Sequence, residues 1–367
     1  MSTQERILLV RLSHLGDVVH ALPVFHALRQ AYPDARVAWA VQREFASLLQ
    51  GLPGLERVLV FERRGGLRAW LDLRQELAVF SPTLAIDAQG NLKSALATLA
   101  SGAPRRVGLA RCDWREPLGA AVLTERALPS SELSGGVHAL DRMLALSRHI
   151  TGLGPDAVLR TDPGLSAAEL ARGRELLARR GPRGNGVLIV LQLARAGDVR
   201  SWPLERFEVL ARRLVGSGRR VLALSGPEEQ AEGLQLERRL AGEDRIAHWV
   251  GQRGLRELAA LWAAAAEQGA RFVGCDSGPL HLAVACGLPV VALAGPQDPC
   301  RTGPWPVPAQ VGGPPARAGE SPHRVVRSAL PPSCAPCLAR RCSHPQGAVC
   351  MSAIEPAAVL AALAAGS

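Results

Sequence analysis

Lysine and aromatic residues are scarce in this chain. Of its 43 basic residues only Lys93 is a lysine, and the other 42 are arginines. Phe, Trp and Tyr together make up 4% of the residues. Proteins that bind single-stranded nucleic acid combine basic grooves with aromatic side chains on which the bases stack. The scarcity of aromatics therefore leaves a basic nucleic-acid-binding protein only as a remote alternative.

Long apolar runs are also missing. The longest stretch without a charged residue, 277–297, is interrupted by histidine, glycine and proline, which argues against a membrane-spanning helix. The short apolar run at 7–10 follows an acidic residue and is not followed by a small-residue cleavage site, so it predicts a buried strand rather than a signal peptide. We expect a cytoplasmic protein, which could still bind to a membrane surface.

The rest of the composition is that of a globular protein with real cores. The chain has 367 residues, of which 47% are hydrophobic and 21% charged. This length favours two domains. The net charge is +10. Such an excess can attract an anionic partner, although arginine codons also accumulate in GC-rich genomes.

Strand and helix patterns alternate along both halves of the chain. Buried apolar runs such as 7–11 and 84–87 are followed by helical periodicity, as at 17–31 and 92–100, and this alternation predicts doubly wound parallel sheets. A Gly-, Pro- and Asp-rich stretch near residues 151–166 predicts a linker. We therefore expect an α/β protein with two Rossmann-like domains facing across a cleft, and a terminal helix capped by Ser352 and Glu355. The predicted bounds are 1–160, 161–350 and 351–367.

Four of the eight cysteines form a cluster near the C-terminus, with the spacing C-x2-C-x4-C-x7-C. Four thiolates can close a tetrahedral zinc site. The alternative is a thiol-rich loop without metal, because only one CxxC is present and the other spacings are irregular. The cysteines in question are Cys334, Cys337, Cys342 and Cys350.

The first candidate site follows the first predicted strand and opens the first helix. Ser13, Gly16 and Asp17 would lie at the carboxyl edge of the sheet, where ligands of such folds bind. Gly16 lets a ligand approach the backbone. Asp17 is either a helix-capping carboxylate or a general base. The stretch does not match GxGxxG, which argues against a dinucleotide cofactor.

The second candidate site repeats this arrangement in the other half. Asp276, Ser277 and Gly278 follow a predicted strand and open a helix, whose N-terminal amides favour an anion such as a nucleotide diphosphate. His281 lies one turn further on, on the same helix face as Ser277. His281 is either a ligand of the bound anion or an ordinary structural histidine.

Further charged residues follow other predicted strands. Arg200 precedes a helix and could pair with phosphate, or could be an ordinary surface arginine. Glu228 or Glu229 could accept hydrogen bonds from ribose hydroxyls, or could simply cap a helix. Basic residues in loops of the first half would form an anion-binding wall if they converge, and would otherwise be solvated surface. These basic residues are Arg63, Arg64, Lys93 and Arg115.

Taken together, these stretches resemble glycosyltransferase family 9, the bacterial ADP-heptose:lipopolysaccharide heptosyltransferases. The similar segments occur in family order between about residues 6 and 300. The Asp-Ala-Gln-Gly and Asp-Trp pairs are most similar to those of heptosyltransferase I. The segments read ILLVRLSHLGDVVHALP, IDAQGNLKSA, DWREP, HALDR, RSWP, CDSGPLHLA and AGPQDP.

The resemblance implies a GT-B fold, with an acceptor-binding N-terminal domain and an ADP-sugar-binding C-terminal domain. It implies inverting transfer of heptose from ADP-L-glycero-D-manno-heptose to the Kdo/heptose inner core of lipopolysaccharide at the inner membrane, without an essential metal. Asp17 would be the general base. The implied donor-binding residues are Ser13, Gly16, Arg200, Glu228, Glu229, Asp276, Ser277, Gly278 and His281, and the implied acceptor-binding residues are Arg63, Arg64, Lys93 and Arg115.

Some features depart from the family pattern. Arg200 stands where the family often has lysine, which keeps the charge and changes the geometry. The loop 192–199 lacks the hydroxyl side chains expected to contact phosphate. These departures leave open the alternative of another sugar-nucleotide enzyme on the same scaffold, a different glycosyltransferase or an epimerase.

Overall fold

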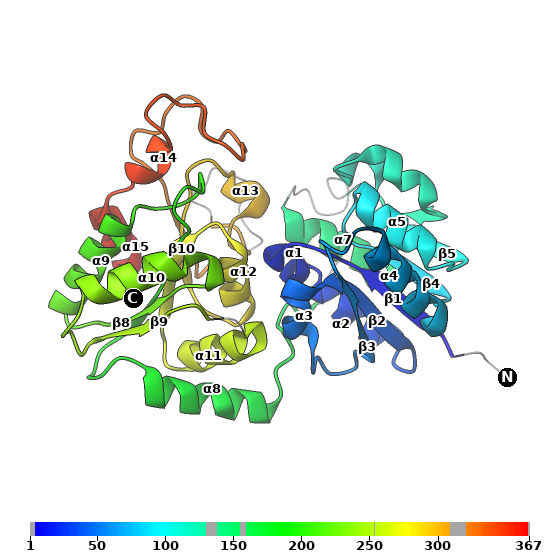
Figure 1. Cartoon of the computed structure of the whole chain (residues 1–367), viewed down its shortest axis with the longest axis horizontal. Coiled ribbons are helices and arrows are strands. Elements are labelled where there is room, and N and C mark those ends of the chain that lie inside the picture. The colour runs from blue at the N-terminus through cyan, green and yellow to red at the C-terminus, as the bar shows by residue number, and fades with distance from the viewer. Residues whose placement is uncertain (1–3, 130–137, 155–158, 253, 309–320, 366–367) are drawn as a thin grey trace. The chain divides into compact units, whose positions relative to one another are not determined.

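The computed structural model divides the chain into two compact units, residues 1–165 and 166–367 (Figure 1). It describes the whole chain except residues 1–3, 130–137, 155–158, 253, 309–320 and 366–367. Each unit has its own parallel sheet. The α/β class and the two Rossmann-like units are confirmed.

The first unit is built on a six-stranded parallel sheet in the order β3-β2-β1-β4-β5-β6. This is a doubly wound order: successive strands are added on one side of β1 as far as β3, and then on its other side from β4 onward. At this switch point a crevice opens between the carboxyl ends of β1 and β4. The strands are β1 (Arg6–Val10), β2 (Arg36–Gln42), β3 (Arg57–Phe61), β4 (Leu84–Asp87), β5 (Arg105–Gly108) and β6 (Glu125–Arg126).

Helices cover both faces of this sheet. On one face, α4 and α5 pack their small and apolar residues, such as Leu73, Leu77 and Ala97, against Leu8 and Val10 of β1. Elsewhere in the unit, α2 packs against α7. The helices are α1 (Leu15–His20), α2 (Leu22–Ala31), α3 (Arg43–Leu49), α4 (Gly66–Phe80), α5 (Leu92–Ala100) and α7 (Ala139–Thr151), with 3-10 turns η1 (Arg111–Asp113) and η2 (Pro117–Val122).

The prediction of a single helix over 17–31 is wrong, because this segment contains two helices, α1 and α2, separated at Ala21. Pro23 explains the division. Its nitrogen carries no hydrogen and cannot donate to the carbonyl of Val19, so a continuous helix would lose a bond there. The break ends α1 after six residues and leaves Asp17 in its first turn.

The second unit repeats the same strand order. Its sheet runs β12-β11-β10-β7-β8-β9, so the reversal falls between β7 and β10. All of its pairs are parallel. The strands are β7 (Leu188–Gln192), β8 (Arg220–Leu224), β9 (Ile246–Trp249), β10 (Arg271–Cys275), β11 (Val290–Leu293) and β12 (Arg324–Val326).

The helices of the second unit include the C-terminal one. Val359 and Leu363 of α15 are buried in the same core cluster as Phe207 and Leu210 of α9, so the C-terminal helix is part of this unit. The helices are α8 (Ala167–Arg180), α9 (Leu204–Gly216), α10 (Gln230–Arg239), α11 (Leu255–Glu267), α12 (Gly278–Ala285), α13 (Pro299–Thr302), α14 (Val349–Ser352) and α15 (Pro356–Ala364), with one 3-10 turn, η3 (Pro227–Glu229).

The capping box predicted for the terminal helix is wrong. Ser352 is the last residue of the short helix α14, and Glu355 is the N-cap of α15 without a capping bond from its side chain. Pro356 follows as the first helical residue, where its fixed backbone angle suits a helix start and its missing N–H costs nothing.

Candidate active site

The loops after β1 and β4 are joined at the switch point of the first unit. The side-chain oxygen of Gln89, after β4, accepts hydrogen bonds from the backbone N–H groups of Leu12 (2.6 Å) and Ser13 (3.3 Å), after β1. The guanidinium of Arg11 donates to the carbonyl of Ala88. These bonds hold the two loops together at the place where a doubly wound sheet binds its ligand.

Asp17 lies in the first turn of α1, and its carboxylate is held by two neighbours. Oδ1 is 2.6 Å from Nη2 of Arg11, and Oδ2 accepts the backbone N–H of His14 at 3.1 Å. Burial alone would raise the pKa of Asp17, but the charge of Arg11 and the hydrogen bonds from His14 outweigh it and lower that pKa. The carboxylate is thus ionised at neutral pH while about a third of it stays exposed.

A buried carboxylate shapes the loop beside Asp17. Asp87, at the end of β4, is fully buried and accepts the backbone N–H groups of Gln89 and Gly90, both at 2.9 Å. Burial raises the pKa of Asp87. Gly90 has φ of +74°, and a Cβ there would lie 3.3 Å from the Cα of Trp114, so glycine is required. Asp87 and Gly90 therefore form the scaffold that presents Gln89.

The four basic residues predicted to bind the acceptor are all exposed. Arg63 and Arg64 lie between β3 and α4, Lys93 is on the first turn of α5, and Arg115 lies between η1 and η2. The backbone N–H of Arg115 donates to the carbonyl of Gly90 at 2.9 Å, which places Arg115 beside the loop after β4. Lys93 and Arg115 thus belong to two segments that are hydrogen-bonded to one another, whereas Arg63 and Arg64 follow β3, which is separated from β4 by β2 and β1 in the sheet.

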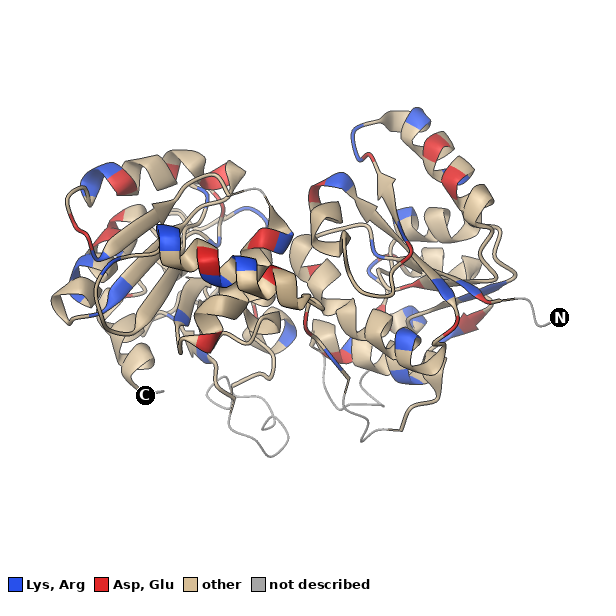
Figure 2. Cartoon of the chain, turned by 90° about the horizontal axis from the view of Figure 1, so that it is seen from below, with Lys and Arg blue, Asp and Glu red and all other residues tan. Residues whose placement is uncertain are grey.

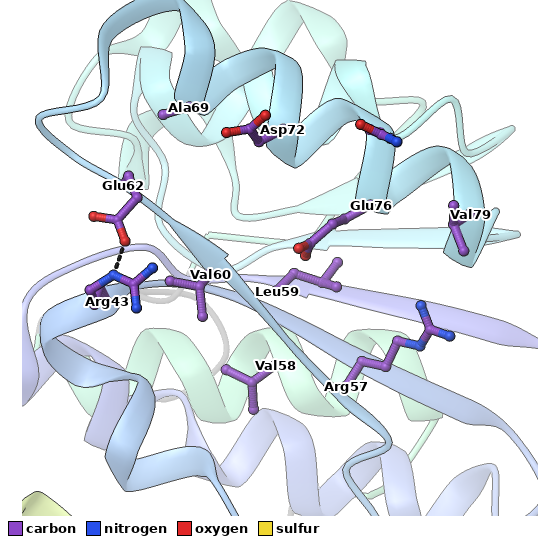
Figure 3. A pocket seen from close by; sticks show the side chains of 11 residues that line it. Arg43, Arg57, Val58, Leu59, Val60, Glu62, Ala69, Asp72, Glu76 and Val79 are labelled. Atoms are coloured by element: carbon purple, nitrogen blue, oxygen red, sulfur yellow. Dashed lines mark hydrogen bonds and ion pairs between the residues drawn. The ribbon is translucent and has the colours of Figure 1, made fainter.

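An open hollow of the first unit lies elsewhere. It has a volume of about 700 Å³ and runs along the free edge of β3 beneath α4, between Arg43 and Glu62 at one end and Arg57 at the other (Figure 3). None of the predicted site residues lines it.

Five of the seven donor-binding residues predicted in the second unit, all except Gly278 and His281, line one pocket at the carboxyl ends of β7 and β10. Its volume is about 180 Å³. It receives side chains from the loops after β7, β8 and β10, as the doubly wound order requires. The polar and charged residues that line it are Gln192, Arg195, Asp198, Arg200, Ser201, Glu228, Glu229, Asp276 and Ser277.

Arg200 is held in place by an aspartate that the sequence did not single out. Nε and Nη2 of Arg200 bind the two carboxylate oxygens of Asp198 at 3.0 and 2.9 Å, and Nη1 donates to the backbone carbonyl of Asp276 at 3.2 Å. The hydrogen bonds to Asp198 raise the pKa of Arg200. The guanidinium thus connects the loops after β7 and β10 at the pocket wall.

Asp276 and His281 are engaged with each other. Nε2 of His281 is 3.3 Å from Oδ1 of Asp276, and both side chains are about one-tenth exposed. The hydroxyl of Thr302 donates to Oδ2 of Asp276 at 2.7 Å. The carboxylate of Asp276 therefore connects α12 to α13, which is a structural role. Direct contact of Asp276 with a donor stays a prediction.

The start of α12 lies at the pocket, which is lined there by Ser277 and Pro279. Ser277 is the N-cap, and its side chain makes no capping bond. Pro279 has no N–H, and the N–H of Leu280 is bonded to the carbonyl of Ser277. The amides of Ser277 and Gly278 and the Ser277 hydroxyl are therefore the groups at this helix end suited to an anion.

Glu228 and Glu229 differ in environment. Glu229 accepts the backbone N–H of Gly226 at 3.1 Å, and burial raises its pKa. Glu228 is largely exposed and pairs with Arg195 at 3.0 Å. Of the two, Glu228 has the carboxylate that can reorient toward a ligand, because Glu229 serves to cap its own turn.

The cysteine cluster lines one small hollow. Cys334, Cys337, Cys342 and the buried Cys350 all border it, together with His344. Within the part of the chain that the structure describes, however, no three His, Cys, Asp or Glu side chains have the arrangement of a metal site. The zinc site stays a prediction.

Sequence reasoning missed several partners of the predicted residues: Arg11, Gln89, Asp198 and Thr302. Nothing in the sequence pattern around Arg11 indicates its contact with Asp17. Asp198 could have been found, since a carboxylate two residues before Arg200 in the same loop can reach its guanidinium. Thr302 could not, because it is 26 residues from Asp276 in the chain.

Known proteins are similar to this chain in sequence. The sequence profile of glycosyltransferase family 9 (heptosyltransferase) matches residues 70–328. Lipopolysaccharide heptosyltransferase 1 of Pseudomonas aeruginosa is 32% identical over 349 residues, which cover 92% of this chain and 88% of that protein. The protein of the same name from Escherichia coli K12 is 28% identical over 310 residues, which cover 80% of this chain and 89% of that protein.

A solved structure shares the fold. The structure described as E. coli heptosyltransferase WaaC with ADP superposes with a TM-score of 0.70 at 22% sequence identity. The match covers 99% of this chain and 100% of that one. At this identity the superposition establishes the common architecture of the two chains.

Proposed function

This chain belongs to glycosyltransferase family 9, and from that membership we propose that it transfers heptose from ADP-L-glycero-D-manno-heptose to the Kdo/heptose inner core of lipopolysaccharide, with inversion. The chain is thus a glycosyltransferase with the GT-B fold. The proposed acceptor is a Kdo-bearing lipid A, since both relatives described above are named heptosyltransferase 1.

One observation carries the assignment of roles. Each sheet gathers polar groups at its own switch point: Asp17 in the first unit, and Arg200 with the Ser277 and Gly278 amides in the second. A carboxylate that is ionised and partly exposed can accept a proton. A guanidinium beside a helix N-terminus can hold a diphosphate.

In the proposed reaction the acceptor hydroxyl attacks the anomeric carbon of the heptose while its proton passes to the carboxylate of Asp17. The bond from that carbon to the diphosphate oxygen breaks, and the electron pair leaves with ADP. Arg200 and the amides of Ser277 and Gly278 would stabilise the departing charge. Attack opposite the leaving group inverts the configuration, and no metal is required.

The other predicted contacts complete the proposal. Glu228, with Glu229 as its alternative, would bind the ribose hydroxyls of ADP, while Ser13 and Gly16 would contact the transferred sugar. The exposed basic residues of the first unit, Arg63, Arg64, Lys93 and Arg115, would bind the anionic Kdo and phosphate groups of the acceptor.

Product identification tests the proposal. The purified protein is incubated with ADP-heptose and either Kdo-lipid A or heptosyl-Kdo-lipid A, and the lipid products are analysed by mass spectrometry. We expect one heptose to be added to Kdo-lipid A. Addition only to the heptosylated acceptor would contradict the acceptor assignment, and no product with either acceptor would favour a different sugar-nucleotide enzyme.

A further inference from the structure

The outer face of α5 is apolar, unlike that of an ordinary surface helix. The helix has nine residues, and its exposed positions are occupied by three leucines and Lys93. The leucines follow the helical spacing i, i+4, i+7, which aligns them in one stripe. A helix that is apolar on its inner and its outer side normally has its outer side covered. The leucines and their exposed fractions are Leu92 (53%), Leu96 (47%) and Leu99 (51%).

Neighbouring segments extend the apolar face of α5. The turn η2 packs against α5, and its Leu118 is 78% exposed. The two segments are tied by the carboxylate of Glu116, which accepts the N–H of Leu92 at 2.7 Å. On the other side, α4 packs against α5 on the same face of the sheet and exposes Leu67 and Leu71 (Figure 1). We call the six leucines 67, 71, 92, 96, 99 and 118 the leucine face.

The residues that surround the leucine face are mainly basic. Six exposed basic side chains belong to the loops and helix starts next to it: Arg63, Arg64, Arg68, Lys93, Arg111 and Arg115. Nearby acids are engaged elsewhere: Glu62 pairs with Arg43, and Asp113 lies 3.8 Å from Arg142. The acids of α4, Asp72 and Glu76, line the separate hollow along β3 (Figure 3). Elsewhere both signs of charge are distributed over the two units (Figure 2).

We propose that the leucine face docks on the surface of an anionic phospholipid bilayer, with its leucines in the interfacial region and the surrounding positive charge attracted to the anionic surface. This combination of apolar and basic residues is typical of segments that lie in a membrane interface without crossing the bilayer. Among the described helices, none is long and apolar enough to cross it. The proposal concerns binding alone and does not depend on the reaction proposed above.

Vesicle binding tests the proposal directly. The whole protein is sedimented with vesicles of phosphatidylethanolamine and phosphatidylglycerol, and with vesicles of phosphatidylcholine alone. We expect binding to the anionic vesicles only, weakening as salt is added. Replacing two exposed leucines, Leu96→Gln and Leu99→Gln together, should reduce the vesicle partition coefficient roughly tenfold or more, because both side chains lose their burial in the interface.

A matched control comes from the second unit, where Val209→Gln and Leu234→Gln change two exposed apolar residues on other helices. This variant should bind vesicles like the unchanged protein. Thermal unfolding of both variants confirms folding, and Leu118→Gln on η2 provides an independent loss of binding if the α5 variant fails to fold. Equal binding by the α5 variant and the control would overturn the proposal.

Two further measurements distinguish a membrane-binding face from an acceptor site and from a dimer interface. Activity on a soluble acceptor that lacks the lipid chains should be unchanged in the α5 variant, and its loss would assign the leucines to the acceptor site instead. A dimer of the unchanged protein that the α5 variant lacks, seen by light scattering, would assign the face to a second copy of the chain. If no heptose is transferred by any form, vesicle binding still decides the present proposal alone.

Discussion

At the level of single residues, Asp17 and Arg11 act as a pair. The sequence singled out Asp17 because it follows a strand and opens a helix, and the structure shows its carboxylate partly exposed there. Arg11 belongs to the same charged group, since its guanidinium connects Asp17 to the loop after β4. Periodicity could not reveal this role, because it depends on two loops that meet only when the sheet forms.

Removing the charge of Asp17 should abolish most activity. Asp17→Asn keeps an oxygen that can accept the N–H of His14 but cannot take a proton from the acceptor. We expect turnover to fall by roughly 10²–10⁴-fold, with ADP affinity nearly unchanged. Steady-state kinetics and calorimetry measure the two quantities, and Asp72→Asn on α4 is the control. Near-normal turnover would show that Asp17 is not the base.

Arg11 should control the pH dependence of the reaction. Its charge lowers the pKa of Asp17, so in the unchanged protein the carboxylate stays ionised as the pH falls and turnover has no acid limb near neutrality. In Arg11→Met that pKa rises, and turnover should begin to fall at a higher pH. Arg11→Lys, which keeps the charge, should restore the original profile.

A pH profile of Arg11→Met that coincides with that of the unchanged protein would contradict this electrostatic role. Thermal unfolding separates it from a folding defect, because Arg11 also donates to the carbonyl of Ala88.

At the level of elements, some segments could be predicted from the sequence with their bounds and others could not. The helix 92–100 and the strand 84–87 have the predicted bounds. The strands β6, β9 and β12 have only two to four residues and were missed. Such strands have too few residues to show a period, and pairing with a neighbour that lies far away in sequence stabilises them.

The helix α8 was also missed, although Ser166 and Glu169 form a capping box at its start.

The ion pair of Glu169 with Arg256 predicts how stability depends on pH. Burial raises the pKa of Glu169, but hydrogen bonds from Arg256 on α11 and from Ser166 outweigh it and lower the pKa to about 2. A carboxylate with a lowered pKa stabilises the folded state above its unfolded pKa and loses this effect as the pH falls toward 2.

We therefore expect Glu169→Gln to reduce the free energy of unfolding at neutral pH by about 1–3 kcal/mol, and the difference to shrink as the pH falls below about 4.5. Urea unfolding at several pH values measures this. Glu175→Gln, which removes an exposed partner of Arg179 on the same helix, should change stability by less than about 0.5 kcal/mol. A pH-independent difference for Glu169→Gln would contradict the electrostatic cause.

At the level of the whole molecule, the two units share one strand order, and each has polar groups at its own switch point. The alternation of strands and helices was enough to predict two doubly wound sheets, because each sheet needs helices on both faces. The bonds that connect loops within each switch point, such as those of Gln89 and Arg200, could not be predicted. They join residues 76 or 77 positions apart.

The separation of the two switch points predicts which unit binds ADP. Hydrogen exchange followed by mass spectrometry should show that ADP protects amides after β7 and β10 in the second unit, including those of Ser277 and Gly278. Amides at residues 13–17 should exchange as before, because ADP lacks the heptose that these residues are proposed to contact. Arg200→Ala should lose the protection at a given ADP concentration, whereas Arg213→Ala on α9 should keep it. Equal protection at residues 13–17 would place ADP in the first unit.

The repeated strand order also affects how such an enzyme can diversify. Because each switch point is formed by loops of its own sheet, the groups proposed for the acceptor and those proposed for the donor are encoded in separate stretches of the gene, before and after codon 166. Drift or recombination in one stretch can then alter one specificity while leaving the other intact. Chimeric genes joined at this codon should inherit acceptor preference from one parent and donor preference from the other.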